Sequence, residues 1–111
     1  MLTVNFEQMF NDLTSGVESI AKDSLKEYES EAKADGKKAL NDMKSNLQQW
    51  AKEVETGLIT KEDLGFLLQE EESLTEMTAL KQAGLAEVHI DQFRNSVINM
   101  IVGTITGLVK V

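Results

Sequence analysis

Cysteine and proline are both absent from this chain of 111 residues. Without cysteine the protein can form no disulfide and carries no thiolate for catalysis or metal binding. Without proline it lacks the residue that most strongly interrupts helices. The absence of disulfides fits a reducing compartment, and the N-terminal MLTVNFEQMFNDL lacks the basic segment and apolar run of a secretory signal. We therefore expect a cytoplasmic protein.

Basic residues are also scarce. Only 11 lysines and arginines stand against 19 acidic residues, which gives a formal net charge of −8. Phosphate backbones are bound mainly through clustered cationic side chains, so no nucleic acid is expected as a partner. The same acidity disfavours adsorption to anionic membrane surfaces. The length predicts a single domain over residues 1–111.

Motifs for catalysis and cofactor binding are missing as well. His89 is the only histidine, so the paired Glu-x-x-His motifs of di-iron bundles are absent and no zinc site is expected. No serine lies in a nucleophile elbow, and no glycine-rich phosphate loop is present. The acidic group of Glu70, Glu71, Glu72 and Glu76 lacks the glycine turn of a calcium loop and is interpreted as a solvated face. We expect no enzyme, no cofactor and no metal.

Apolar residues recur at intervals of three and four from Phe6 to Val54. This spacing predicts amphipathic helices with narrow apolar seams, as in bundles and coiled coils. The seam comprises Phe6, Phe10, Leu13, Val17, Ile20, Leu25, Tyr28, Ala32, Leu40, Met43, Leu47, Trp50 and Val54. Asp35-Gly36 is a turn signal within this stretch, and we favour a bend or turn there. The alternative is one very long N-terminal helix of roughly 75 Å.

The clearest helix start is at Thr60. Threonine is a good N-cap residue, and Asp63 stands in the third helical position, where its carboxylate completes a capping box. Gly57 is placed to end the preceding helix. The apolar spacing after Thr60 predicts one helix that continues to about Ala83.

A last helix is predicted to begin near Gln92, with Asp91 as its N-cap. The preceding LAEVHI alternates like a short strand, but no second strand is apparent, so it is expected to be helix or loop. No residue from Asn95 to Val109 is charged. The polar positions of this helix form one narrow strip, which comprises Gln92, Asn95, Ser96, Asn99, Gly103, Thr106 and Lys110.

The other sides of the last helix are apolar, so most of its circumference must be buried. One small bundle is expected to cover only part of it, and a second copy of the chain is the simplest cover for the rest. The segment would span only about 20 Å, short of the roughly 30 Å core of a bilayer, which disfavours a membrane helix. A strand is a weaker alternative, because strict alternation is lacking. The interface candidates are Trp50, Val97, Ile98, Ile101, Ile105 and Leu108.

Taken together, these patterns predict an all-α fold, an antiparallel bundle of three or four amphipathic helices. The expected function is non-enzymatic protein–protein association, either as a self-assembling bundle, with a dimer favoured, or as a small adaptor. Two alternatives stay open. The apolar last helix could serve an amphipathic binder of lipid surfaces or apolar ligands. The negative charge could serve an acidic inhibitor of a basic partner.

Overall fold

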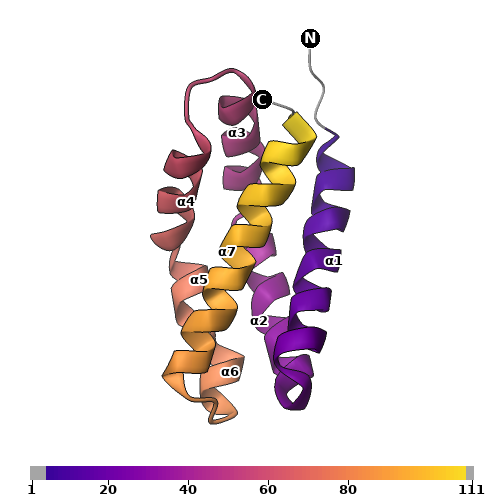
Figure 1. Ribbon diagram of the computed structural model, residues 1–111, viewed down its shortest axis with the longest axis vertical. Coiled ribbons are helices and arrows are strands. Elements are labelled where there is room, and N and C mark those ends of the chain that lie inside the picture. Colours follow the sequence, from indigo (N-terminus) through magenta and orange to yellow (C-terminus); the bar gives the residue numbers. More distant parts are fainter. Residues whose placement is uncertain (1–4, 110–111) are drawn as a thin grey trace.

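The computed structural model describes residues 5–109, which fold into helices and short connections with no strand among them (Figure 1). The predicted all-α fold is confirmed. The elements are α1 (Phe6–Ser24), the 3-10 turn η1 (Lys26–Tyr28), α2 (Glu29–Asp42), α3 (Lys44–Glu55), α4 (Lys61–Gln69), α5 (Glu72–Glu76), α6 (Thr78–Gln82) and α7 (Glu87–Val109).

These helices form four antiparallel arms. α1 runs down the molecule, α2 and α3 return, α4 to α6 descend again, and α7 runs back up between the other arms (Figure 1). α7 packs against α1, α3, α4 and α6, while α2 packs against α1, α5 and α6. The bundle is elongated, with extents of 46 × 23 × 19 Å. The core lies along the axis of the bundle, where the four arms meet.

α1 begins at the N-cap Asn5, whose side chain accepts a hydrogen bond from the Gln8 amide at 3.0 Å. Its buried face steps by four residues, and its members are Met9, Leu13, Val17 and Ala21. The seam predicted from the sequence is centred slightly to one side of this face, because Phe6, Phe10 and Ile20 are only partly buried.

The bend predicted at Asp35-Gly36 is wrong, because α2 passes through both residues without interruption. The chain reverses earlier, at Leu25, whose φ of −135° and ψ of 59° end α1. This reversal also excludes one very long N-terminal helix. Glycine at position 36 serves a close approach: a β-carbon there would lie 2.4 Å from Val17 Cγ1. Local turn propensity is overridden by packing between α1 and α2.

The helix start at Thr60 is confirmed. Thr60 Oγ1 accepts from the Asp63 amide at 3.1 Å, and an Asp63 carboxylate oxygen accepts from the Thr60 amide at 3.0 Å. Gly57, with φ of +80°, adopts the left-handed conformation that ends α3. The prediction of one helix as far as Ala83 is wrong, however. The arm is divided into α4, α5 and α6, with one of its breaks at Met77.

α7 begins at Glu87, so the predicted N-cap role of Asp91 is also wrong. The carbonyl of Ala86 accepts from the amides of His89 at 3.0 Å and Ile90 at 3.1 Å, which starts the helix one turn earlier. Asp91 lies inside the helix, where it pairs with Arg94. The expectation of helix or loop for residues 85–90 is confirmed.

The polar strip of α7 is where the sequence places it: Gln92, Asn95, Asn99 and Gly103 are exposed. The bundle covers more of the apolar circumference than expected, although Met100, Val102 and Leu108 are only partly buried. The neighbouring arms of the same chain bury the apolar side chains Phe93, Val97, Ile98, Ile101, Ile105 and Val109. Lys110 and Val111 lie outside the described residues.

α1 packs against α7 as well as against α2. A β-carbon at Gly16 would lie 2.5 Å from the sulfur of Met100. Within residues 5–109, no helix combines the length and the hydrophobicity that crossing a membrane requires.

Candidate interaction surface

The predicted interface residues divide into two groups. Val97, Ile98, Ile101 and Ile105 are buried within their own chain, so they belong to the core of the bundle. Trp50 and Leu108 are partly buried and pack against that core. A partner could reach the first group only if the bundle opened. Contacts made by the closed bundle must involve other residues.

Three large apolar side chains stand out on the surface of the described residues. Leu58 is 75% exposed, Phe66 is 64% exposed and Val88 is 58% exposed. Leu58 lies in the connection between α3 and α4, and Phe66 lies on α4 itself. Val88 lies in the first turn of α7, near the other end of the bundle (Figure 1). The first two residues therefore belong to the α3–α4 connection and the helix that follows it.

The sequence contains a signal for the exposure of Phe66, which lies outside the predicted seam. Leu64 and Leu68 are spaced by one helical turn and both are buried. A residue midway between two such positions lies near the opposite side of a helix. The three consecutive apolar residues Phe66, Leu67 and Leu68 cannot all face one core, and Phe66 is the one left outside.

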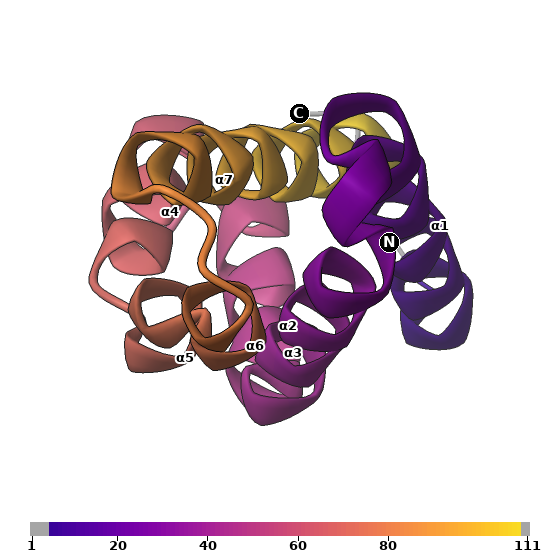
Figure 2. The same ribbon diagram turned by 90° about the horizontal axis from the view of Figure 1, so that it is seen from below.

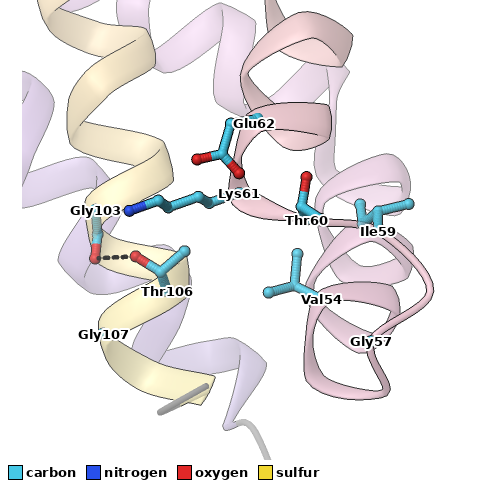
Figure 3. Close-up of a pocket in the computed structure, with 9 residues that line it drawn as sticks. All are labelled: Val54, Gly57, Ile59, Thr60, Lys61, Glu62, Gly103, Thr106 and Gly107. Carbon is cyan, nitrogen blue, oxygen red and sulfur yellow. Dashed lines mark hydrogen bonds between the residues drawn. The ribbon is translucent and has the colours of Figure 1, made fainter.

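A hollow of about 620 Å³ lies between the start of α4 and the C-terminal half of α7 (Figure 3). Its lining combines small or apolar residues with one residue of each charge. The lining residues are Val54, Gly57, Ile59, Thr60, Lys61, Glu62, Gly103, Thr106 and Gly107. In Figure 3 the Lys61 side chain extends across the hollow towards Gly103 and Thr106.

The polar groups of the hollow are largely satisfied within the chain. Thr106 Oγ1 donates to the carbonyl of Val102, at 2.8 Å, or to that of Gly103, at 3.3 Å. The hydroxyl is thus turned back onto its own helix. The capping box likewise occupies the side chain of Thr60. What α7 presents here is a shallow strip of backbone, since a β-carbon added at Gly103 or Gly107 would meet nothing within 4 Å.

Phe66 lies on α4 about one helical turn beyond this hollow. It follows Glu62, which lines the hollow, by four residues, so both side chains project from one face of α4. α4 and α7 pack together and run antiparallel (Figure 1). The exposed ring therefore lies on the outward face of α4, about one helical turn beyond the hollow that Gly103 and Gly107 line. We call the region of Leu58, Phe66, Gly103 and Gly107 the α4–α7 surface.

Two other hollows differ in character. One, of about 440 Å³, lies between α1 and α3 and includes Phe6, Phe10 and Lys44. The Lys44 ammonium stands 5.3 Å from the Phe10 ring centre, and that of Lys52 stands 5.6 Å from the Phe6 ring centre. These lysines cover aromatic faces that would otherwise meet water. This groove therefore already has cover from its own chain.

The second of these hollows is acidic and lies between α2 and α5, lined by Asp42, Glu71, Glu72, Ser73 and Glu76. Among the described residues, no group of three or more histidine, aspartate or glutamate side chains could hold a metal ion. His89 is exposed, with Nδ1 at 3.4 Å from Gln92 Oε1. The acidic group predicted as a solvated face lies on the surface.

Comparison with protein-family models, curated proteins and solved structures found no match.

Proposed function

We propose that the protein acts through protein–protein association, and that the α4–α7 surface binds a second copy of the chain. The observation that carries this proposal is Phe66, an aromatic ring that is 64% exposed on α4, about one helical turn beyond the hollow lined by Gly103 and Gly107. Complete burial of a phenylalanine contributes about 1.5–3 kcal/mol, and aromatic anchors dominate many interfaces. An exposed aromatic ring near a shallow hollow is therefore well suited to contact between two proteins.

A second copy is favoured as the partner because the exposed ring and the two glycines lie on α4 and α7, which pack against each other in the same chain. In a two-fold dimer the same patch of both subunits forms the interface. Every contact between two different residues then occurs twice, once on each side of the symmetry axis. Phe66 of one chain can then lie over Gly103 and Gly107 of the other. Lys61 and Glu62 lie next to each other on this surface and can pair with their opposites across the axis.

Net charge acts against self-association. Each chain carries a formal charge of −8, so two chains repel each other at long range. Added salt screens this repulsion, with a screening length of about 8 Å at physiological ionic strength. Association through the α4–α7 surface should therefore strengthen as salt is raised. An acidic chain that captured a basic partner would show the opposite dependence.

The test is light scattering coupled to size exclusion, at several protein concentrations and at low and high salt. We expect the wild-type chain to approach the mass of two chains at high concentration. Phe66→Asp should have the mass of a monomer, with unchanged circular dichroism and melting temperature. Val88→Asp is the matched control, because it alters a similarly exposed residue near the other end of the bundle, and it should still dimerise. A wild-type protein that stays monomeric at all concentrations would refute the proposal.

A further inference from the structure

The break between α5 and α6 is unusual in its backbone. Met77 has φ of 41° and ψ of 51°, and it is the only non-glycine residue with positive φ in the described part of the chain. A left-handed conformation costs an L-residue energy because its β-carbon crowds the following carbonyl. The Met77 side chain is nevertheless buried. The strain must therefore be held in place by the surrounding structure.

The local sequence does not favour this break. Residues 72–82 read ESLTEMTALKQ and contain no glycine or proline. Leucine, methionine, alanine, glutamate, lysine and glutamine are all good helix formers. By itself this segment would continue as one helix through Met77. The cause of the break has to lie outside the segment.

One cause is Asp35 on α2. Its Oδ1 accepts from the amide of Ala79 at 2.9 Å, and its Oδ2 accepts from the amide of Leu80 at 2.8 Å. Asp35 is only 6% exposed, and it is the one buried polar or charged residue among those described. These two amides belong to the first turn of α6, where a carboxylate is also favoured by the helix dipole. Asp35 therefore caps α6 from another arm of the bundle.

The other cause is Arg94 on α7, the only arginine of the chain. Its Nε donates to the carbonyl of Leu74 at 2.8 Å, and its Nη2 donates to the carbonyl of Thr75 at 3.2 Å. Nη1 is held by Asp91. The arginine side chain is 16% exposed. It thus binds the carbonyls near the end of α5, where a cation is favoured.

Two charges from different arms therefore hold the two sides of one strained residue. We propose that α5–α6 is a latched cover: Asp35 and Arg94 fasten residues 72–82 over α2, and loss of either contact lets this segment open while the rest of the bundle stays folded. Opening would expose Leu74, Met77 and Leu80 together with the faces of α2 beneath them.

The size of the two helices supports opening as a unit. Each has five residues, and helices this short do not persist without tertiary contacts. Relief of the Met77 backbone strain also favours the opened segment. Regions with few internal hydrogen bonds and strained connections open at lower free energy than long core helices. Figures 1 and 2 place the pair at one edge of the bundle, beside α2, where it can move without displacing α1.

Native-state hydrogen exchange, followed residue by residue by NMR at low denaturant concentrations, tests this proposal. In the wild-type protein, the amides of Ala79 and Leu80 should exchange by local opening, faster than those in the middle of α1 and α7. Asp35→Asn should reduce their protection roughly tenfold to hundredfold, as expected for loss of hydrogen bonds to a charged group. Asp42→Asn is the control, because Asp42 lies on the same helix but pairs with Lys38 at the surface.

Arg94→Lys is the second variant, since it keeps the positive charge but loses the fork that binds two carbonyls at once. It should also reduce protection at Ala79 and Leu80 while leaving α1 unchanged. The proposal is overturned if these amides exchange only with global unfolding in the wild-type protein. It is equally overturned if both variants weaken protection uniformly in every helix. The wild-type measurement decides the matter even if Asp35→Asn fails to fold.

Discussion

Val17 and Gly36 face each other across α1 and α2, so closely that a β-carbon on Gly36 would stand 2.4 Å from Val17 Cγ1. Val17 is fully buried in this contact. The absence of a side chain at position 36 lets the two helix backbones approach. A substitution at position 36 therefore tests whether the glycine in α2 serves close packing or backbone flexibility.

Gly36→Ala should destabilise the protein by about 1–3 kcal/mol, because overpacking outweighs the gain in helix propensity. Gly65→Ala is the matched control: it also lies within a helix, and a β-carbon there meets nothing within 4 Å. That change should stabilise by up to about 1 kcal/mol. Urea unfolding measures both. If the two substitutions shift the unfolding midpoint in the same direction, the contact with Val17 does not exclude a β-carbon at position 36.

Thr60→Ala should lower stability by about 1 kcal/mol, because the Asp63 amide loses its acceptor in the capping box. Thr60→Ser keeps a hydroxyl at the same place and should change stability much less. Thermal unfolding followed by circular dichroism compares the three proteins. Equal melting temperatures for the alanine and serine variants would contradict the role of the cap.

Ile101→Ala should cost about 2–5 kcal/mol, since the side chain is fully buried within its own chain. Ile101→Asp should leave the protein unfolded, because it would place an unpaired charge in the core. Circular dichroism and size exclusion distinguish this result from a folded monomer. A well-folded monomeric Ile101→Asp variant would show that this residue lies at an interface.

The ion pair between Glu18 and Lys37 joins α1 to α2, with 2.9 Å between the carboxylate oxygen and the ammonium. Its hydrogen bond and charge lower the pKa of Glu18 below the ordinary 4.5. A group with a lowered pKa in the folded state stabilises the protein above its unfolded pKa, and this contribution disappears as pH falls through the folded pKa. The pair should therefore act at neutral pH and be lost at pH values below about 4.5.

An NMR titration of the Glu18 carboxyl carbon checks this directly. Lys37→Met should raise its titration midpoint towards the ordinary value. Lys61→Met, which removes the same charge from α4, should leave the midpoint in place. No change on loss of Lys37 would mean that the ion pair is not formed in solution.

Features that depend on neighbours in the sequence could be predicted. The capping box of Thr60 and Asp63 is closed by residues three positions apart, and both of its hydrogen bonds are present. The polar strip of α7 also follows from helical periodicity alone. Local signals of this kind are readable because the interacting groups are brought together by one turn of helix.

Features that depend on distant partners could not be predicted. Asp35 appears in the sequence as half of a turn signal, because the amides that it binds belong to Ala79 and Leu80 on another arm. The break at Met77 could not be predicted either, because the residues that hold it, Asp35 and Arg94, lie on other arms. The extent of burial of Ile101 was underestimated, because helix periodicity does not tell how many neighbours surround a helix. The exposure of Phe66 could have been predicted from its place between Leu64 and Leu68.

The close contact between α1 and α7 has a consequence for how the protein is made. A β-carbon at Gly16 would lie 2.5 Å from the sulfur of Met100, although α7 is translated after all the other helices of the bundle. While the ribosome adds the arms in order, α2 can cover the side of α1 that contains Val17, but the side that packs against α7 stays uncovered. That side of α1 then remains available to water or to a chaperone. The bundle can close only after α7 has left the exit tunnel.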